Sequence, residues 1–150
     1  MPPALGRSFG LALLAALLAS CQAAFAPLRP RWPAFPDGHF MHVGQFLQVT
    51  GTGRPAKTTL SQTQERSEAR DAALVDAWGR LKAYLEALPY DRTGSVGAAA
   101  KANAALAQSL EQVIFKAEIV ETRYDGSMAA VVVRVDKDAL NRMLDTEFRQ

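Results

Sequence analysis

One segment constrains the fold of this chain more than any other: residues 61–88 have the pattern of a single long amphipathic helix. Ser61 and Gln64 have the spacing of a capping box, and Pro89 follows the last periodic residue. Apolar side chains recur in alternating steps of four and three, which gives the helix one broad face to bury. That face consists of Leu74, Trp78, Leu81, Leu85 and Leu88, flanked by Ala73, Ala77 and Tyr84. A second layer must cover this face.

Strand patterns lie on both sides of this helix. The first begins near Phe40 and ends at a turn-rich stretch over residues 50–55. Two more surround Asp125-Gly126, a tight-turn pair, and they predict an antiparallel hairpin from about residue 113 to residue 135. A second helix is predicted between residues 98 and 113, from the helical spacing of Ala102, Ala105, Leu106, Leu110 and Val113. A final helix capped by Asp136 or Asp138 would bury Leu140, Met143, Leu144 and Phe148.

This order of elements predicts an α+β fold. It runs strand, helix, helix, strand, strand, helix, with a small antiparallel sheet of about three strands packed with one long helix and two shorter ones. Residues 40–150 have the length of one domain. Because so small a sheet leaves strand edges unpaired, we expect a homo-oligomer that uses the hairpin edge.

The N-terminal residues 1–20 have the pattern of a secretory signal. A single basic residue, Arg7, precedes an apolar run from Phe9 to Leu18 that is too short to span a membrane. The run ends in Leu-Ala-Ser-Cys, which resembles a bacterial lipobox. That resemblance implies cleavage between Ser20 and Cys21 and acylation of Cys21 with chains such as palmitate. The alternative is an ordinary signal peptide that leaves Cys21, the one cysteine of the chain, as an idle thiol.

Residues 21–39 are predicted to be a lipidated cysteine followed by a proline-rich tether. Prolines occur at every third position, as in polyproline II: Pro27, Pro30, Pro33 and Pro36. The simplest interpretation is a stiff spacer. A second stripe of Arg29, Trp32 and Phe35 leaves open that the segment lays two aromatic rings on a neighbour, and recognition by a proline-binding module is a further alternative.

A longer resemblance runs over residues 43–140. It rests on Val49–Gly53, on the alanine-rich segment Glu68–Leu81 and on Ala117–Thr122. With the lipobox upstream, the chain resembles the LPP-twenty outer-membrane lipoproteins, including flagellar relatives of the FlgP type. The resemblance implies a non-enzymatic, lipid-anchored protein of the outer membrane, facing the periplasm. It also implies assembly of a flagellar outer-membrane ring, a role in motility and partners among flagellar envelope proteins. The alternative is a periplasmic small-ligand carrier or an enzyme of unknown substrate.

Two histidines raise the question of a metal site. His39 and His42 stand three residues apart, close to Asp37, and together they could offer two nitrogens and one oxygen to zinc. Without cysteines or further acidic residues nearby, ordinary histidines at the end of a tether are the simpler interpretation. Ser95 has no histidine close to it in the sequence, so a hydrolase triad is not predicted.

The stretch Gly51–Thr58 resembles a phosphate-binding loop, but incompletely. Ala56 stands where the loop needs a glycine before Lys57, and Pro55 removes a backbone donor. We therefore expect a turn at the end of a strand and no nucleotide.

Charged residues point to no catalytic or nucleic-acid site. The helical carboxylates Glu68, Asp71 and Asp76 lie among arginines, where solvated ion pairs are the default. Lys and Arg total 17 against 15 acidic residues, which is too balanced for a nucleic-acid binder. We expect no enzyme activity, no cofactor and no metal.

Overall fold

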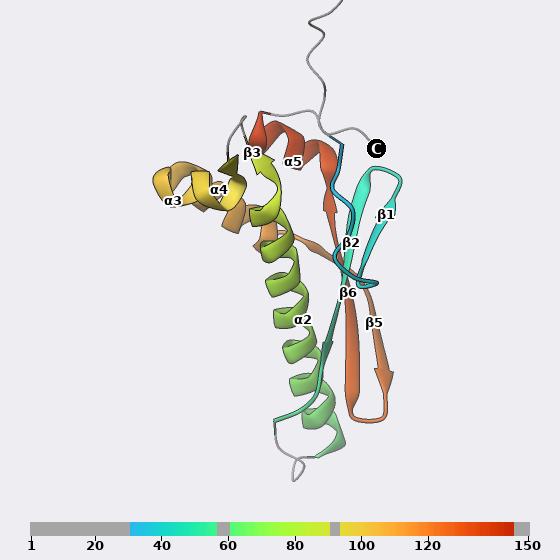
Figure 1. Ribbon diagram of the computed structural model, residues 1–150. Helices are drawn as coiled ribbons and strands as arrows, with labels where there is room; N and C mark the ends of the chain where they lie inside the picture. Colours follow the sequence, from blue (N-terminus) through green and yellow to red (C-terminus); the bar gives the residue numbers. More distant parts are fainter. Residues whose placement is uncertain (1–30, 57–60, 91–93, 146–150) are drawn as a thin grey trace, which may run out of the picture. The chain divides into compact units, whose positions relative to one another are not determined.

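The computed structural model describes residues 31–56, 61–90 and 94–145, and in them it confirms the α+β class. The main sheet has four antiparallel strands in the order β1-β2-β6-β5 (Figure 1). These strands are β1 (Phe40–Val43), β2 (Phe46–Gly53), β5 (Glu118–Asp125) and β6 (Met128–Asp136). A separate pair is formed by β3 (Pro89–Tyr90) and β4 (Gly94–Ser95). The described helices are α2 (Gln62–Ala87), α3 (Val96–Ala102), α4 (Ala104–Phe115) and α5 (Lys137–Leu144).

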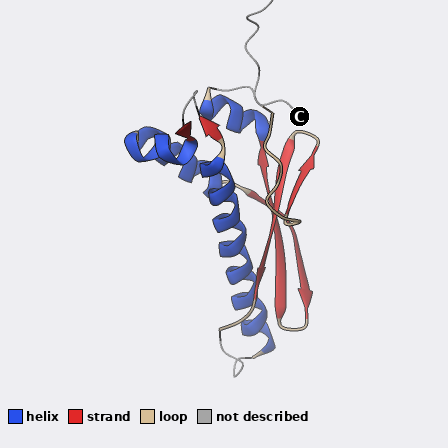
Figure 2. Cartoon of the chain, viewed as in Figure 1, coloured by secondary structure: helices blue, strands red, loops and turns tan. Residues whose placement is uncertain are grey.

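The long predicted helix is α2, and its start is the predicted capping box. The Ser61 hydroxyl accepts from the Gln64 amide, and the Gln64 side chain accepts from the Ser61 amide in return. The helix ends at Ala87, two residues before Pro89, which lacks the amide needed to continue it. Figure 2 shows α2 running alongside the sheet, and it packs on β2 and β6.

Two glycines of β2 allow α2 to approach the sheet closely. A Cβ atom on Gly51 would lie 2.2 Å from the carbonyl oxygen of Ala73 and 2.3 Å from the amide nitrogen of Ala77. A Cβ on Gly53 would meet the amide nitrogen of Ala73 at 2.2 Å. A glycine inside a strand often marks such a close approach. Small residues on both elements therefore set the distance between helix and sheet.

The core lies between α2 and the two central strands. In the β2–β6 ladder, the pairs Leu47 with Val135 and Val49 with Val133 bring inward-facing side chains opposite each other. Leu81 and Leu85 of α2 are also fully buried. Figure 1 shows α3, α4 and α5 gathered near the C-terminal end of α2, where Leu110, Ile114 and Leu140 extend the core.

The structure departs from the predicted order in several places, and it has four strands in the main sheet and the added pair β3–β4 where about three strands were predicted. A turn at Gly44, whose φ is +56°, divides the first predicted strand region into the hairpin β1–β2. The expected second helix is two helices, because Asn103 ends α3 and its side chain caps α4 by accepting from the amides of Ala105 and Leu106. Asparagine offers the backbone this alternative to a continuous helix.

The predicted hairpin and final helix are present, but the hairpin begins at Glu118 and not near residue 113, because α4 continues to Phe115. Gly126, with φ +58°, lies in the two-residue turn between the paired residues Asp125 and Met128. Asp136 caps α5, since its carboxylate accepts from the amide of Asp138. Phe148, predicted on the buried stripe, lies outside the described residues.

Candidate functional site

Strand β5 is an exposed edge of the sheet. Among the described strands it pairs only with β6, and every one of its residues except Thr122 is exposed. Three of its exposed side chains are large and apolar: Ile119, Val120 and Tyr124. A strand edge with apolar side chains is a surface on which another strand can pair.

The turn geometry fixes which backbone groups of β5 point outward. In a two-residue hairpin the pair that closes the turn is hydrogen-bonded, and bonded and non-bonded pairs then alternate along the ladder. Counting from Asp125 and Met128, the amides of Arg123 and Glu121 point toward β6. Those of Thr122 and Tyr124 therefore point away from it. The ladder has a register shift between Ile119 and Glu121, which ends this regular stretch.

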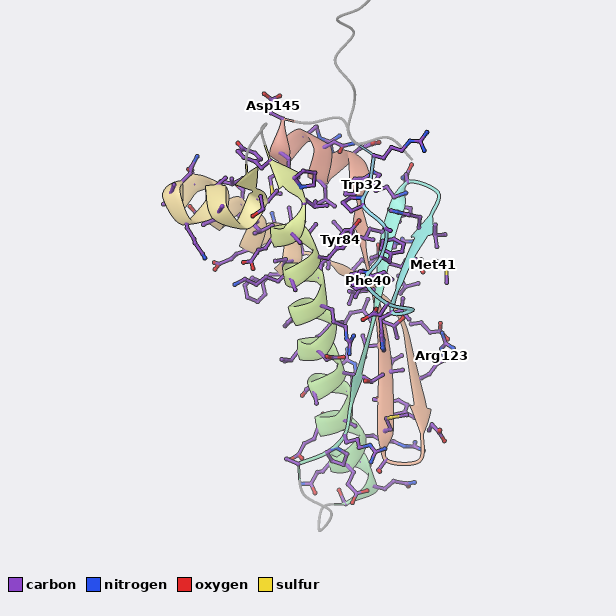
Figure 3. The ribbon with its side chains drawn as sticks, viewed as in Figure 1. Trp32, Phe40, Met41, Tyr84, Arg123 and Asp145 are labelled. Carbon is purple, nitrogen blue, oxygen red and sulfur yellow. The ribbon has the colours of Figure 1, made fainter. Side chains whose placement is uncertain are left out.

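Two oppositely charged residues of β5, Glu121 and Arg123, lie two positions apart and form an ion pair. Arg123 Nε lies 2.7 Å from Glu121 Oε1, and both side chains are well exposed. Figure 3 shows Arg123 pointing outward from the sheet. On the other side of β5, Arg66 of α2 lies over the ring of Tyr124, 5.5 Å from its centroid.

The opposite edge of the sheet is bordered by residues 31–39, which we call the strap. Trp32 is buried, and the Phe35 ring stacks on Phe40 with centroids 5.5 Å apart. The Tyr84 hydroxyl donates to the carbonyl oxygen of Pro33 at 3.2 Å. These residues belong to the predicted tether, and the interpretation in which Trp32 and Phe35 lie on a neighbour matches what they do here. The neighbour is the domain of the chain itself.

An ion-pair network joins the strap to α2. Arg80 donates from Nη1 to Asp37 at 3.2 Å and from Nε to Asp76 at 2.9 Å. Asp76 also accepts from the amide of Thr52 in β2 at 2.9 Å. Burial alone would raise the pKa of Asp76, but the Thr52 amide and the Arg80 guanidinium outweigh it and hold that pKa below its ordinary value. Asp76 is therefore ionised at neutral pH.

Tyr84 lies at the centre of the strap contact. Its ring packs against Phe40 and Phe35, with centroids 5.1 and 5.7 Å away. Burial raises the pKa of Tyr84 to about 12. Its hydroxyl therefore stays neutral through the physiological range and keeps its donor for the strap.

We expect Tyr84→Phe to lower the free energy of unfolding by about 1 kcal/mol at neutral pH, because the strap loses a hydrogen bond. An unfolded tyrosine ionises near pH 10 and the folded Tyr84 near pH 12, so the unfolded state sheds its proton first. Stability should therefore fall as the pH rises between these values. The variant should lack this part of the alkaline decline, measured by urea unfolding across the pH range.

Tyr124→Phe is the matched control for that experiment. Its ring is exposed on β5. At neutral pH the free energy of unfolding should change by less than about 0.5 kcal/mol. An equal loss in both variants would contradict the role given to Tyr84.

A lysine and a histidine lie near the β1–β2 turn. Lys137 is buried, and its ammonium donates to the carbonyl oxygen of Gly44 at 2.7 Å. Burial lowers the pKa of Lys137. His42 contacts the rings of Trp32 and Phe35, and partial burial, then the charge of Lys137, lower the pKa of His42. Both groups serve to join the turn, the strap and the start of α5.

The residues considered for metal binding have structural contacts. His39 Nδ1 lies 3.1 Å from the Thr50 carbonyl oxygen, and the His39 amide donates to Asp37. In the part of the chain that the structure describes, no group of three or more potential ligands lies together. Ser95 caps α3 by accepting from the amide of Ala98. Of the phosphate-loop stretch, residues 51–53 continue β2 and residues 57–58 lie outside the description.

Ser20 and Cys21 also lie outside the described residues. Cleavage between them and acylation of Cys21 stay predictions, as do the limits 1–20, 21–39 and 40–150. Among the helices that are described, none combines the length and the apolar character needed to cross a membrane.

Comparison with known family models shows which family the chain belongs to. The family model of the Roadblock/LC7 domain matches residues 55–140, more than half of the chain. The chain belongs to the Roadblock/LC7 family. The match runs from the residues before α2 into α5, so it includes the long helix, α3, α4 and the β5–β6 hairpin. No curated protein and no solved structure matches the chain.

The resemblance to LPP-twenty and FlgP-type lipoproteins is therefore wrong. The same match overturns four predictions that depended on this resemblance. They are the outer-membrane lipoprotein function, the role in flagellar assembly and motility, the lipid-anchored location at the outer membrane and the flagellar partners. The carrier or enzyme of unknown substrate gains no support from Roadblock/LC7 membership either. The resemblance failed because alanine-rich helices and valine-rich strands report close packing of a helix on a sheet, which many families share.

Two features of this Roadblock/LC7 domain could not be predicted from the sequence: the outward-facing residues of β5 and the contact between the strap and α2. The prediction named the hairpin edge without the residues that face outward, which depend on the turn at Gly126. It also treated Asp37 and Arg80 separately, although they lie 3.2 Å apart. They are 43 positions apart in the chain, so no local pattern could have paired them.

Proposed function

We propose that this Roadblock/LC7 domain is a non-enzymatic regulatory module that acts by association, and that β5 pairs with β5 of a second copy. The observation that carries the proposal is an eight-residue edge strand with nearly all of its side chains exposed. The outward amides of Thr122 and Tyr124 supply the donors for such a pair. Ile119, Val120 and Tyr124 supply the apolar surface.

The charges of β5 select one register for this pair. If two antiparallel strands meet with Thr122 opposite Thr122, then Glu121 of each copy lies opposite Arg123 of the other. Val120 then lies opposite Tyr124. A shift that centres the pair on Glu121 or on Arg123 places like charges opposite each other, which is destabilising. Outward backbone groups at Thr122 agree with the first register.

The test of this register uses charge reversal. Glu121→Arg and Arg123→Glu should each weaken self-association about tenfold, because two pairs of like charges then face each other. Mixing the two variants should restore association, since each arginine strand then meets a glutamate strand. Analytical ultracentrifugation of each protein and of the mixture gives the result. The proposal is wrong if the unsubstituted protein is monomeric, or if the mixture associates no more tightly than either variant alone.

A backbone variant tests the pairing independently of charge. Thr122→Pro removes an outward amide and should abolish association while the domain stays folded, because the ladder with β6 does not use that donor. Arg123→Pro removes an amide that points toward β6 and should destabilise the domain itself. Circular dichroism and sedimentation together separate the two effects. Full association of folded Thr122→Pro would show that the contact lies elsewhere.

A further inference from the structure

Strand β2 continues beyond its neighbour β1 and therefore has a free edge of its own. β1 pairs with Phe46–Val49, whereas β2 runs on to Gly53 (Figure 1). Over residues 50–53, which we call the β2 edge, β6 is the one neighbour of β2 among the described strands. A strand added in line with β1 would extend the sheet at this edge.

Two amides of the β2 edge are bonded to groups that do not belong to a strand. The Thr50 amide donates to the carbonyl oxygen of His39, in the strap, at 2.7 Å. The Thr52 amide donates to Oδ2 of Asp76, in α2, at 2.9 Å. An incoming strand needs these amides as donors for its own carbonyl groups. At Thr52 the Asp76 carboxylate already holds the donor.

Asp76 is held in this position by an arginine of its own helix. Arg80 donates from Nε to Asp76 at 2.9 Å. A hydrogen bond from an amide to an ionised carboxylate is stronger than one to a neutral carbonyl group. Just past the β2 edge, Glu68 of α2 accepts from the Ala56 amide in the same way, at 3.2 Å. Two carboxylates of one helix therefore bond amides along this side of the chain.

We propose that Asp76 is a specificity residue for association, which keeps β5 of a second copy from pairing with the β2 edge. This inference rests on the proposed pairing through β5. Strand β1 is only four residues long, and short edge strands pair poorly, so the β2 edge is the stretch that needs such a residue. A contact between β5 and the β2 edge would join two different surfaces. It would not close into a pair and would continue from copy to copy.

The test is to remove the acceptor with Asp76→Ala. Analytical ultracentrifugation of this variant should show species larger than a pair, with a share that rises with protein concentration. The unsubstituted protein should form pairs and nothing larger. In the Thr122→Pro background, which prevents pairing through β5, Asp76→Ala should make hydrogen exchange of the Thr52 amide about tenfold faster, because that amide loses its acceptor. Circular dichroism checks that each variant is folded.

Two matched variants separate the acceptor from the ion pair. Asp76→Asn removes the charge and keeps an oxygen that can accept from Thr52, so its assemblies should be no larger than those of the parent. Arg80→Ala removes the ion pair and leaves the carboxylate, and it should behave likewise. Asp76→Ala combined with Thr122→Pro should lose the larger species, because β5 then lacks an outward donor. Aggregation of an unfolded protein would not be reversed by that second change.

Three results would overturn the inference. If Asp76→Ala assemblies are no larger than those of the parent, other features close the β2 edge. Larger species in Asp76→Asn or Arg80→Ala would assign the effect to the charge or to the ion pair. Larger species that persist in the double variant would exclude β5 as the occupant. A monomeric parent would instead contradict pairing through β5, whereas the bond between Asp76 and Thr52 is measured by hydrogen exchange in a monomer as well.

Discussion

Gly51→Ala should destabilise this domain by more than about 3 kcal/mol. The added Cβ would lie 2.2 Å from one backbone atom of α2 and 2.3 Å from another. Neither contact can be relieved by turning a side chain, so helix and strand must separate along the centre of the core. Overpacking costs about 1–3 kcal/mol where side chains can adjust, and here they cannot. Urea unfolding followed by circular dichroism measures the loss.

Gly79→Ala is the matched control on the opposing element. Gly79 lies inside α2. Apart from its chain neighbours and the adjacent backbone of the helix itself, no atom lies within 4 Å of a Cβ built there. Alanine in a helix interior is favoured over glycine by about 1 kcal/mol, so this variant should be more stable than the parent. If Gly51→Ala lowers the free energy of unfolding and Gly79→Ala raises it, then the loss at Gly51 is caused by its close packing against α2. A Gly51→Ala protein as stable as the parent would contradict the helix–sheet distance described above.

Trp32→Ala should have the second-largest effect, a loss of about 3–5 kcal/mol. Trp32 is 8% exposed and belongs to the core cluster, although it lies in the proline-rich segment. A residue of a plain spacer would cost almost nothing to replace. The variant therefore distinguishes a strap that is part of the folded domain from a tether beside it.

Thermal unfolding of Trp32→Ala gives the first measurement, and a drop of about 10 °C or more is expected for a domain of this size. Proton exchange or fluorescence of Trp78 reports whether the rest of the core survives. Arg31→Ala, at the exposed neighbouring position, is the control and should shift the midpoint by no more than a few degrees. Equal effects of the two substitutions would contradict the anchoring role of Trp32.

The sequence was sufficient to predict the elements that are specified by residues close together in the chain. The capping box at Ser61 and the periodic leucines define α2 without any other part of the chain. The Asp125-Gly126 turn defines the β5–β6 hairpin in the same way. These signals act over a few residues, so one sequence suffices to find them.

Long-range contacts were not accessible in that way. The strap is fixed by Tyr84 and Arg80, which follow it by 51 and 43 positions. Gly51 was assigned to a turn at the end of a strand, although it continues β2, because the backbone of Ala73 that it contacts is on another element. The family was misassigned for a related reason, since the alanines of α2 report how tightly the helix packs and say little about ancestry.

The strand order has a consequence for valency. Because β1 and β5 are the two edges of one sheet, a pair formed through β5 would leave both β1 edges at its ends, each bordered by its own strap. A partner carrying two segments that bind this end of the domain, on a linker of the right span, could then engage both ends at once. Its second contact would be made at an effective concentration set by the linker, so weak individual sites would give tight binding to the pair and weak binding to a single copy.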